Sequence, residues 1–288
     1  MRTLVFGVTG MLGQALRKTI RRRGNEFIGS APCDSDYNID FADGEAVDDV
    51  LNKIRPEIVI NAAAITDCSA CERDVGSAYR VNARPSSFIA DWARRNDAYY
   101  VYISTDHFFT GDGDKLHDED SPVVLLNEYA RSKYLGEVLT QLHSESLVVR
   151  TNIVGFRGWS TPTFVEWAIA SLKSKTNVTL FDDYYTSSIP VSLFSESLCD
   201  LIDRQPVGTI NLAARHAVSK KDFVLALARK MNLPCDHVAS GSIASLTTCR
   251  AESLGLDVSR AETLLGYTLP NLDDVIERLC LDYQENEQ

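Results

Sequence analysis

The 288-residue sequence contains no apolar stretch that approaches the ~20 consecutive residues required for a membrane-spanning helix. It also has no basic excess, because 29 lysines and arginines stand against 40 acidic residues and give a formal net charge of −11. A sequence-independent nucleic-acid binder needs a basic surface, so this charge argues against that class of protein. It does not argue against a small anionic ligand, which needs only a local positive site. We therefore expect a protein that binds neither nucleic acid nor membranes.

Cysteines are few, odd in number and scattered, which does not suggest a disulfide framework: there are 7 in the chain. Cys68 and Cys71 have the spacing of half a zinc knuckle or of a redox pair, but no second pair or His-x-x-x-His partner accompanies them. We expect no metal site there, and a loop that leads into a helix. Residues 3–7 form a strand-like run at the start of the chain, without the layout of a signal peptide, so we expect a cytoplasmic protein.

The first half of the chain alternates short apolar runs with helix-like segments, which is typical of a parallel sheet covered by helices on both faces. We expect strands over 3–8, 26–30, 58–61, 99–103 and 146–150, and helices over 11–23, 46–54, 74–95 and 127–143. After residue 151 the alternation loosens, and 232–258 reads as irregular. There we expect helices over 162–173, 191–204, 219–231, 259–265 and 272–284, and strands over 177–181 and 209–212.

Three glycines, Gly7, Gly10 and Gly13, lie where the first expected strand turns into the first helix. Glycine at 7 and 10 lets the backbone turn tightly and approach a pyrophosphate, and Gly13 lets the helix pack close to the sheet. The helix N-terminus adds backbone donors and the positive end of the helix dipole. This placement favours a dinucleotide site.

Tyr129 and Lys133 are four residues apart in an expected helix, so their side chains leave it on one face. A lysine beside a tyrosine favours the phenolate and can lower the phenol pKa from ~10 toward a value useful for proton transfer. The same spacing is also common on solvated helix faces, so the pair by itself leaves both interpretations open.

Further motifs follow the glycine turn in order, and together they resemble the short-chain dehydrogenase/reductase superfamily. They are an Asn-Ala-Ala segment at 61–64, a helix asparagine at Asn82, Ser104-Thr105 at the end of the fourth strand, and Tyr129/Lys133 followed by Gly136-Glu137. Within the extended branch the chain is similar to dTDP-4-dehydrorhamnose reductases and related sugar-nucleotide reductases. The similar segments are 103–111 (ISTDHFFTG), 119–133 and 182–187 (DDYYTS).

The resemblance implies an α/β fold: a Rossmann-like doubly wound parallel sheet with a smaller, discontinuous substrate-binding lobe. We expect the NAD(P)-binding domain to comprise 1–153 and about 191–215, and the substrate-binding lobe about 154–190 and 216–288. In the reaction that the resemblance implies, hydride is delivered to the C4 ketone of a nucleotide-activated 4-dehydro-6-deoxysugar. Tyr129 would donate the proton, Lys133 would hold the nicotinamide ribose and keep the phenol acidic, and Thr105 would hydrogen-bond the carbonyl oxygen.

The resemblance also implies which residues bind the ligands. The expected cofactor-binding residues are Gly7, Thr9, Gly10, Met11, Leu12, Gly13, Asp40, Phe41, Asn61, Ala62, Ala63, Ala64, Asn82, Ser104, Tyr129 and Lys133. The expected substrate-binding residues are Thr66, Asp106, His107, Asn152 and Arg250. The cofactor is expected to be NADP(H) or NAD(H), the partner a nucleotide sugar, the state a monomer or homodimer, and no bound metal is expected.

The chain departs from the family pattern at four places. The segment 26–33 ends without the acidic residue that binds the ribose of NAD and without an arginine for the phosphate of NADP, which favours NADP(H) slightly. His107 replaces a tyrosine, for which a partly buried packing histidine is the preferred interpretation, and 150–155 (RTNIVG) lacks the family's tryptophan. Arg250 lies near an Arg-Pro pair that helps to hold the pyrophosphate, although an exposed arginine without a ligand is an equal alternative. Three of these departures lie where the substrate would be recognised.

Two other functions remain open from the sequence. A nucleotide-sugar epimerase or dehydratase uses the same Tyr/Lys pair, although Asp106 is followed by His107 and not by the glutamate typical of dehydratases. A cofactor-binding regulatory subunit without turnover is a different class, because the beta subunit of methionine adenosyltransferase resembles the same family.

Overall fold

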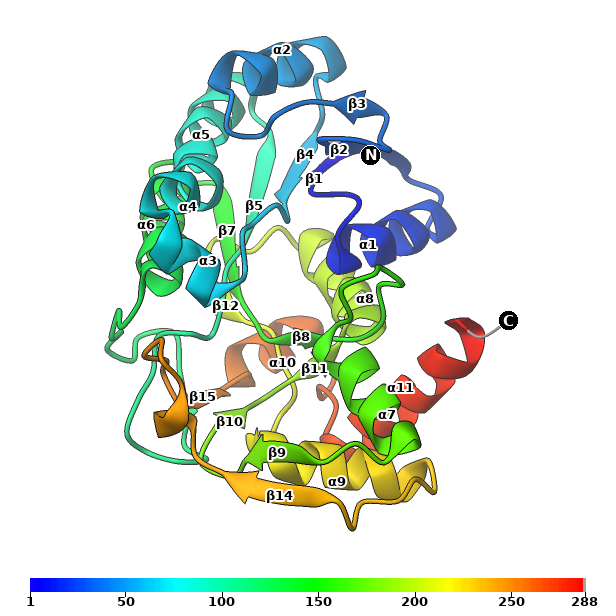
Figure 1. The fold of residues 1–288 in the computed structure, drawn as a ribbon. Coiled ribbons are helices and arrows are strands. Elements are labelled where there is room, and N and C mark those ends of the chain that lie inside the picture. Colours follow the sequence, from blue (N-terminus) through cyan, green and yellow to red (C-terminus); the bar gives the residue numbers. More distant parts are fainter. Residues whose placement is uncertain (287–288) are drawn as a thin grey trace. The chain divides into compact units, whose positions relative to one another are not determined.

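The computed structural model describes residues 1–286, which form two compact units (Figure 1). Unit 1 comprises Met1–Thr105, Leu125–Arg150 and Ser195–Ile210. Unit 2 comprises Asp106–Val124, Thr151–Phe194 and the chain from Asn211 onward. The segment 106–124 therefore groups with unit 2, whereas the sequence analysis included it in the NAD(P)-binding domain. Which unit binds cofactor and which binds substrate stays a prediction at this point.

Unit 1 is built on a seven-stranded sheet with the strand order β12-β7-β5-β4-β1-β2-β3. The pairings from β3 to β7 are all parallel. The strands are β1 (Arg2–Phe6), β2 (Glu26–Ala31), β3 (Tyr37–Asn38), β4 (Ile58–Asn61), β5 (Tyr99–Ile103), β7 (Ser146–Arg150) and β12 (Gly208–Asn211). Every residue of β4 and β5 is buried, as expected for strands that helices cover on both faces.

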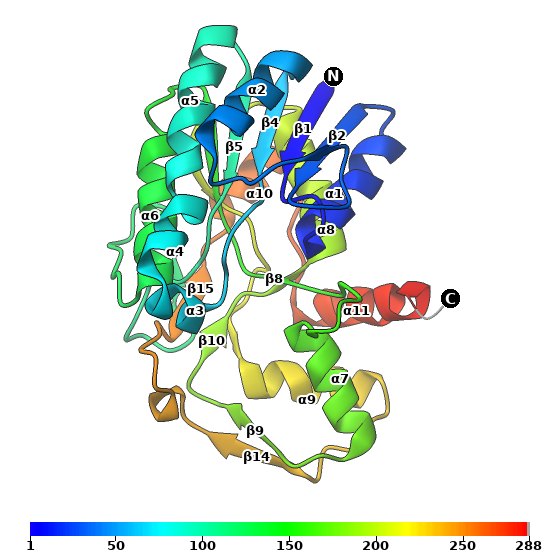
Figure 2. The same ribbon diagram turned by 45° about the horizontal axis from the view of Figure 1, so that its top comes forward.

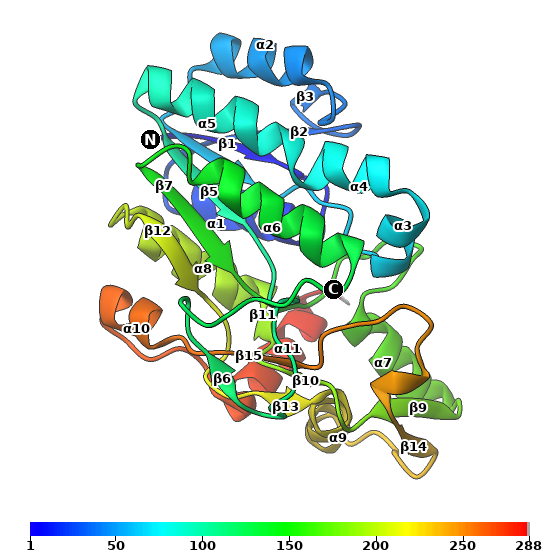
Figure 3. The ribbon, with the colours of Figure 1, turned by 90° about the vertical axis from the view of Figure 1, so that its left-hand side faces the viewer.

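Helices cover both faces of this sheet, which confirms the predicted doubly wound α/β class. Figures 1 and 3 show α2, α5 and α6 side by side on one face, with α1 on the other. On the α1 face, α1 contacts α8 through a 2.9 Å hydrogen bond between the hydroxyls of Thr19 and Ser195. The helices are α1 (Met11–Arg22), α2 (Gly44–Ile54), α3 (Cys68–Arg73), α4 (Val75–Asn82), α5 (Arg84–Asn96), α6 (Glu128–Thr140) and α8 (Val191–Ile202), which begins in unit 2.

The core of unit 1 lies between the sheet and the helices α2 and α5. Tyr100 and Tyr102 of β5 and Trp92 of α5 are among its largest fully buried side chains. The indole Nε1 of Trp92 donates to Asn52 Oδ1 of α2 at 2.8 Å, so the largest core residue also satisfies its polar atom.

The prediction of one helix over 74–95 was wrong, because α4 and α5 are separate helices that meet at Ala83. Pro85 lies in the first turn of α5, where its missing N–H costs nothing, but it could not continue the hydrogen bonds of α4. Asp74 caps α4 by accepting from Ser77 N at 2.9 Å.

Unit 2 has a four-stranded sheet with the order β13-β10-β15-β6 and two strand pairs, β11-β8 and β14-β9. Its core packs α7, α9 and α11 against β9, and Figure 2 shows these helices above the β9-β14 pair. Its strands are β6 (Leu116–His117), β8 (Ile153–Val154), β9 (Val178–Phe181), β10 (Tyr185–Thr186), β11 (Ile189–Pro190), β13 (Val218–Ser219), β14 (Val238–Gly241) and β15 (Ser253–Leu256). Its helices are α7 (Phe164–Ser174), α9 (Lys220–Lys230), a 3₁₀ turn η1 (Ile243–Ser245), α10 (Ser259–Leu265) and α11 (Leu272–Asn286).

The expectation that 232–258 is irregular was wrong, because β14 and β15 lie within it. The two strands read Val-Ala-Ser-Gly and Ser-Leu-Gly-Leu, so small residues and glycine replace the branched and aromatic side chains that mark strands in a sequence. By contrast, Ser219 was correctly predicted as an N-cap, since its hydroxyl accepts from Asp222 N at 3.0 Å.

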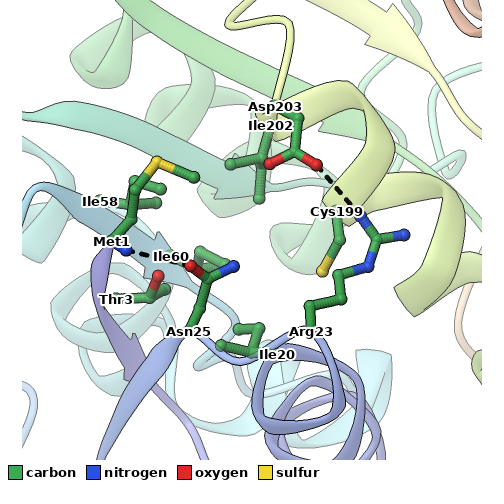
Figure 4. Close-up of a pocket in the computed structure, with 10 residues that line it drawn as sticks. All are labelled: Met1, Thr3, Ile20, Arg23, Asn25, Ile58, Ile60, Cys199, Ile202 and Asp203. Carbon is green, nitrogen blue, oxygen red and sulfur yellow. Dashed lines mark hydrogen bonds and ion pairs between the residues drawn. The ribbon is translucent and has the colours of Figure 1, made fainter.

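A small cavity in unit 1 lies at the amino ends of β1 and β4, where Met1, Thr3 and Ile58 line it together with Cys199 of α8 (Figure 4). This is the opposite end of both strands from Gly7 and Asn61. Ligands of open parallel sheets bind at the carboxyl ends of the strands, so this cavity is not the candidate site.

Within residues 1–286, no helix is both long enough and apolar enough to cross a membrane.

Candidate active site

The glycine turn after β1 lies against the segment that follows β4. Gly7 has φ 85°, and a Cβ added to it would lie 2.7 Å from Ala63 N and 2.8 Å from the carbonyl of Ala62. A Cβ on Gly13 would lie 2.5 Å from Val8 Cα. Only glycine therefore fits at these two positions. The strand order reverses direction between β1 and β4, which is the topological switch point where doubly wound sheets bind ligands.

The N-terminus of α1 is suited to a pyrophosphate. Gly10 is its N-cap residue, no side chain caps the helix, and its first turn carries no acidic residue. The first backbone N–H groups are thus left as donors at the positive end of the dipole. Thr9 and Met11 are half-buried beside this turn, and Leu12 is buried. These residues fit a dinucleotide.

The residues expected near the adenine differ in exposure. Asp40 is exposed, and its carboxylate accepts from Ala42 N at 2.9 Å. Phe41 is buried, with its ring centroid 4.8 Å from that of Phe6, so it belongs to the core. Beyond β2 the chain folds back, and the Asp36 carboxylate accepts from Gly29 N at 2.8 Å. An acidic side chain therefore does lie beside β2, although the segment 26–33 contains none at its end.

Asn61 and Asn82 hold the loop that follows β4. Asn61 Oδ1 accepts from Ala63 N at 3.2 Å, and the half-buried run of residues 62–64 follows. Asn82 Oδ1 accepts from Ile65 N at 2.8 Å, and its Nδ2 donates to Ile65 O and to Ser132 Oγ at 3.0 Å each. The Asn82 amide is thus engaged by backbone and by α6, which gives it a structural role. Its predicted contact with cofactor stays a prediction. Thr66 is exposed in the same loop.

Tyr129 lies in the first turn of α6, which Asn127 caps by accepting from Ala130 N at 2.9 Å. Tyr129 is 7% exposed and packs in a cluster with Cys68, Cys71 and Ala78. Both cysteines lie in α3, and burial raises the pKa of the Cys71 thiol to about 11, so it stays protonated and acts as an apolar packing residue. In the described residues no group of three or more His, Cys, Asp or Glu side chains could hold a metal ion.

Lys133 lies one turn after Tyr129 and is 2% exposed. Its Nζ donates to Ile103 O at 2.7 Å and lies 4.2 Å from the centroid of the Tyr102 ring. Burial lowers the Lys133 pKa to about 7, and the Glu137 carboxylate partly opposes this effect. The Lys133 pKa therefore lies near neutral pH, and its ammonium is bonded to the last residue of β5, two residues before Thr105.

Thr105 is 3% exposed and directly follows Ser104 at the end of β5. Ser104 donates its hydroxyl to Glu137 Oε1 at 2.5 Å. The Ser104 side chain is thus engaged within the protein, and its predicted contact with cofactor stays a prediction. Unit 1 thus brings together α6, with Tyr129 and Lys133, and the end of β5 that leads to Thr105.

Unit 2 holds a chain of buried and half-buried polar side chains that begins directly after Thr105. Asp106 is 1% exposed and accepts from Asn152 Nδ2 at 2.7 Å. Asn152 Oδ1 accepts from Ser188 Oγ at 2.7 Å, and Ser188 Oγ in turn accepts from Lys220 Nζ at 3.3 Å. Burial lowers the Lys220 pKa to about 8, while Asp106 opposes the shift. Two of the predicted substrate residues, Asp106 and Asn152, are thus joined in one network with Lys220.

His107 is close to the same network, because its Nε2 lies 3.3 Å from Tyr184 OH and 4.0 Å from Asp106 Oδ1. Burial, and then the charges of Arg250 and Lys220, lower the His107 pKa to about 3, so the ring is neutral at physiological pH. Arg250 Nε is buried and makes no hydrogen bond within the described chain. The charge of Arg250 thus acts on His107, and the predicted role of both residues in substrate binding stays a prediction.

Several residues of these clusters were absent from the predicted site: Arg150, Tyr184, Ser188 and Lys220. Arg150 could have been found as a charge at the end of an apolar strand, because such a charge needs a partner when the strand is buried. Ser188 and Lys220 lie in segments without a motif, so no signal in the single sequence points to them.

Comparisons with known proteins agree with this fold. The family described as RmlD substrate binding domain matches residues 1–284. A curated relative, "Probable low-salt glycan biosynthesis reductase Agl14" of Haloferax volcanii, is 28% identical over 97% of this chain and 97% of its own length. The dTDP-4-dehydrorhamnose reductase of Shigella flexneri is 30% identical over 68% of this chain and 65% of its own.

Solved structures give the same result. The crystal structure described as a hypothetical dTDP-4-dehydrorhamnose reductase from Sulfolobus tokodaii is 31% identical, with a TM-score of 0.84, and the match covers 95% of this chain and 99% of that one. The dTDP-4-dehydrorhamnose reductase of Bacillus anthracis, solved with NADP, has a TM-score of 0.88 at 24% identity over 98% and 99% of the two chains, which shows the shared fold. The chain therefore belongs to the RmlD substrate-binding domain family and is an NAD(P)-dependent oxidoreductase of the extended short-chain dehydrogenase/reductase superfamily.

Proposed function

We propose that this protein reduces the 4-keto group of a nucleotide-activated 4-dehydro-6-deoxysugar with NADPH or NADH. The observation that carries the proposal is the placement of Lys133. Its ammonium is buried on the Tyr129 face of α6 and is bonded to Ile103 O, two residues before Thr105. The names of the relatives, sugar-nucleotide and glycan-biosynthesis reductases, support the substrate class.

When bound, the nicotinamide cofactor supplies the hydride that reduces the ketone carbon. The turn Gly7–Gly13 and the N-terminus of α1 would hold its pyrophosphate, and the segment 61–64 would line the same site. Lys133 lies one turn after Tyr129 on the same face of α6, and its positive charge would favour the phenolate that forms as the proton leaves. Tyr129 gives that proton to the substrate oxygen, and the Thr105 hydroxyl donates a hydrogen bond to the same oxygen as charge develops.

Unit 2 supplies the substrate contacts in this proposal. Arg250 offers a guanidinium whose Nε has no partner in the described chain, which suits the diphosphate of a nucleotide sugar. His107 is neutral and lies beside Tyr184, so it can donate or accept a hydrogen bond to a sugar hydroxyl without adding charge.

The choice between the two cofactors follows from the loop after β2. The sequence favours NADP(H) slightly, because the segment 26–33 lacks an acidic residue that would repel the 2′-phosphate. Asp36, bonded to Gly29 N, opposes this preference. An Asp36→Asn variant is expected to improve the use of NADPH relative to NADH, which a comparison of kcat/KM for the two cofactors measures.

The deciding experiment follows NADPH and NADH consumption with a panel of nucleotide-linked 4-keto-6-deoxysugars, with the products identified by NMR. Oxidation of free cofactor with one panel member supports the proposal. Tight cofactor binding without oxidation supports the regulatory class, and interconversion of sugar epimers without net cofactor consumption supports an epimerase.

A further inference from the structure

Gly136 and Glu137 follow Lys133 on α6, and the proposed reaction assigns them no role. A Cβ added to Gly136 would lie 2.6 Å from Asn82 O, so glycine is needed where α6 packs closest to α4. Glu137 is 2% exposed. A carboxylate that is almost fully buried requires compensation by charge and hydrogen bonds, so its partners indicate what it does.

The Glu137 carboxylate joins the ends of two neighbouring strands. Its Oε2 accepts from Arg150 Nη2 at 2.9 Å, and its Oε1 accepts from Arg150 Nε at 3.0 Å. Arg150, 5% exposed, is the last residue of β7. The remaining donor to Oε1 is Ser104 Oγ at 2.5 Å, directly after β5. Two-pronged guanidinium–carboxylate pairs of this kind are geometrically specific as well as strong.

Glu137 also continues the catalytic face of α6. Tyr129, Lys133 and Glu137 are spaced by four residues each, so they follow one another on one side of the helix. Lys133 bonds to Ile103 O and Glu137 bonds to Ser104, so two successive turns of α6 hold two successive residues before Thr105.

We propose that Glu137 is a positioning residue for the reductase reaction: held by Arg150, it fixes the end of β5 against α6 and keeps the Lys133 ammonium charged and in place. This inference rests on the proposed function for its kinetic consequence, but its structural content can be measured without turnover. The electrostatic part agrees with the geometry, because the Glu137 charge raises the pKa of Lys133 against the larger lowering by burial.

The test compares three variants: Glu137→Gln, Arg150→Met and the double variant Glu137→Met/Arg150→Met. The single changes leave one member of the pair buried without its partner, so these variants are expected to unfold more easily. The double change removes both charges, and replacing a whole buried pair by apolar residues is often neutral for stability. The double variant is therefore the informative one.

In the double variant, folded by circular dichroism, we expect kcat to fall by about 10²-fold, since small misplacements of catalytic groups have effects of this size. We also expect the alkaline limb of the kcat profile to move to lower pH, because Lys133 loses its proton more easily without the carboxylate. A folded double variant with wild-type kcat and an unshifted limb would overturn the inference.

A second readout needs no substrate. NMR of lysine labelled with ¹³C at Cε follows the titration of Lys133, assigned with Lys133→Met, in wild type and in Glu137→Gln. A lower Lys133 midpoint in the variant supports the inference, and an equal midpoint overturns it. If the wild-type protein reduces none of the sugars in the panel, the proposed function fails. The titration of Lys133 still decides the role of Glu137 in that case.

Discussion

The two units each contain a polar cluster, fully buried in unit 1 and partly buried in unit 2, and the clusters are built differently. The Glu137 cluster of unit 1 (Ser104, Lys133, Glu137 and Arg150) joins opposite charges directly, at 2.9 Å between Glu137 and Arg150. The Asp106 cluster of unit 2 (Asp106, Asn152, Ser188 and Lys220) links its two charges through neutral side chains. The first arrangement is rigid and complete within the protein. The second leaves ammonium protons of Lys220 available, beside an Arg250 whose Nε makes no hydrogen bond in the described chain.

This difference fits a division of work between reaction and recognition. A site that serves one proton transfer benefits from fixed geometry, whereas a site that binds a substrate must exchange internal contacts for contacts to the ligand. Three of the four departures from the family pattern fit the same division, since His107, Asn152 and Arg250 all belong to unit 2.

The largest expected effect is a difference in kcat between variants of Tyr129 in unit 1 and Tyr184 in unit 2. Tyr129→Phe removes the proposed proton donor, so we expect kcat to fall by about 10²–10⁴-fold with cofactor affinity unchanged. Tyr184→Phe, the matched control in unit 2, loses only the hydroxyl near His107 and is expected to change kcat by less than about 10-fold. Steady-state kinetics and NADPH fluorescence titration measure the two effects. Retained turnover in Tyr129→Phe would refute its role.

A second comparison concerns stability. Arg150→Met leaves Glu137 as an unpaired buried carboxylate, so we expect a loss of about 3–5 kcal/mol in the free energy of unfolding. Lys220→Met removes a cation that makes no direct ion pair with Asp106 and whose Nζ lies 4.7 Å from the centroid of the Phe164 ring, so we expect a change within about 1 kcal/mol. Urea denaturation of both variants measures the difference. Equal losses would show that the clusters do not differ as described.

The sequence predicts the fold well because the fold depends on local signals. Residue type and order are enough to predict the glycine turn at 7–13 and the apolar strand 58–61. The break between helices at Ala83 could not be predicted from the sequence, because it depends on how α4 packs. The strand β14 could not be predicted either, because it depends on pairing with β9. Ser188 and Lys220 of the Asp106 cluster were missed for a related reason. Ser188 and Lys220 are brought to Asn152 by the fold of unit 2, across 36 and 68 positions of sequence, and no local pattern records such contacts.

The pH dependence of stability offers a further comparison between Lys133, which is buried, and Lys220, which is half-buried. Lys133 and Lys220 have pKa values lowered to about 7 and about 8, against 10.5 for an exposed lysine. Because their folded pKa is the lower one, each disfavours the folded state while charged, and this penalty is relieved as pH rises from the folded pKa toward 10.5. We therefore expect Lys133→Met to remove a rise in stability that begins near pH 7, and Lys220→Met one that begins near pH 8. Urea unfolding at a series of pH values measures both, and identical onsets would contradict the assignment.

The smallest expected effect tests His107, the residue that stands where the related reductases have tyrosine. Its pKa is lowered to about 3 by burial and by the charges of Arg250 and Lys220, so we expect its ring to remain neutral from about pH 5 to pH 8. In NMR spectra of ¹⁵N-labelled histidine, its ring signals should stay constant over that range, and His107→Gln should leave the pH profile of kcat unchanged. A neutral ring can form a hydrogen bond with a sugar hydroxyl without adding a charge to the site. A protonated ring would add a third positive charge to those of Arg250 and Lys220. A midpoint within this range would instead make His107 a titrating group of the substrate site, and it would mean that Asp106, not Arg250 and Lys220, dominates the field at the imidazole.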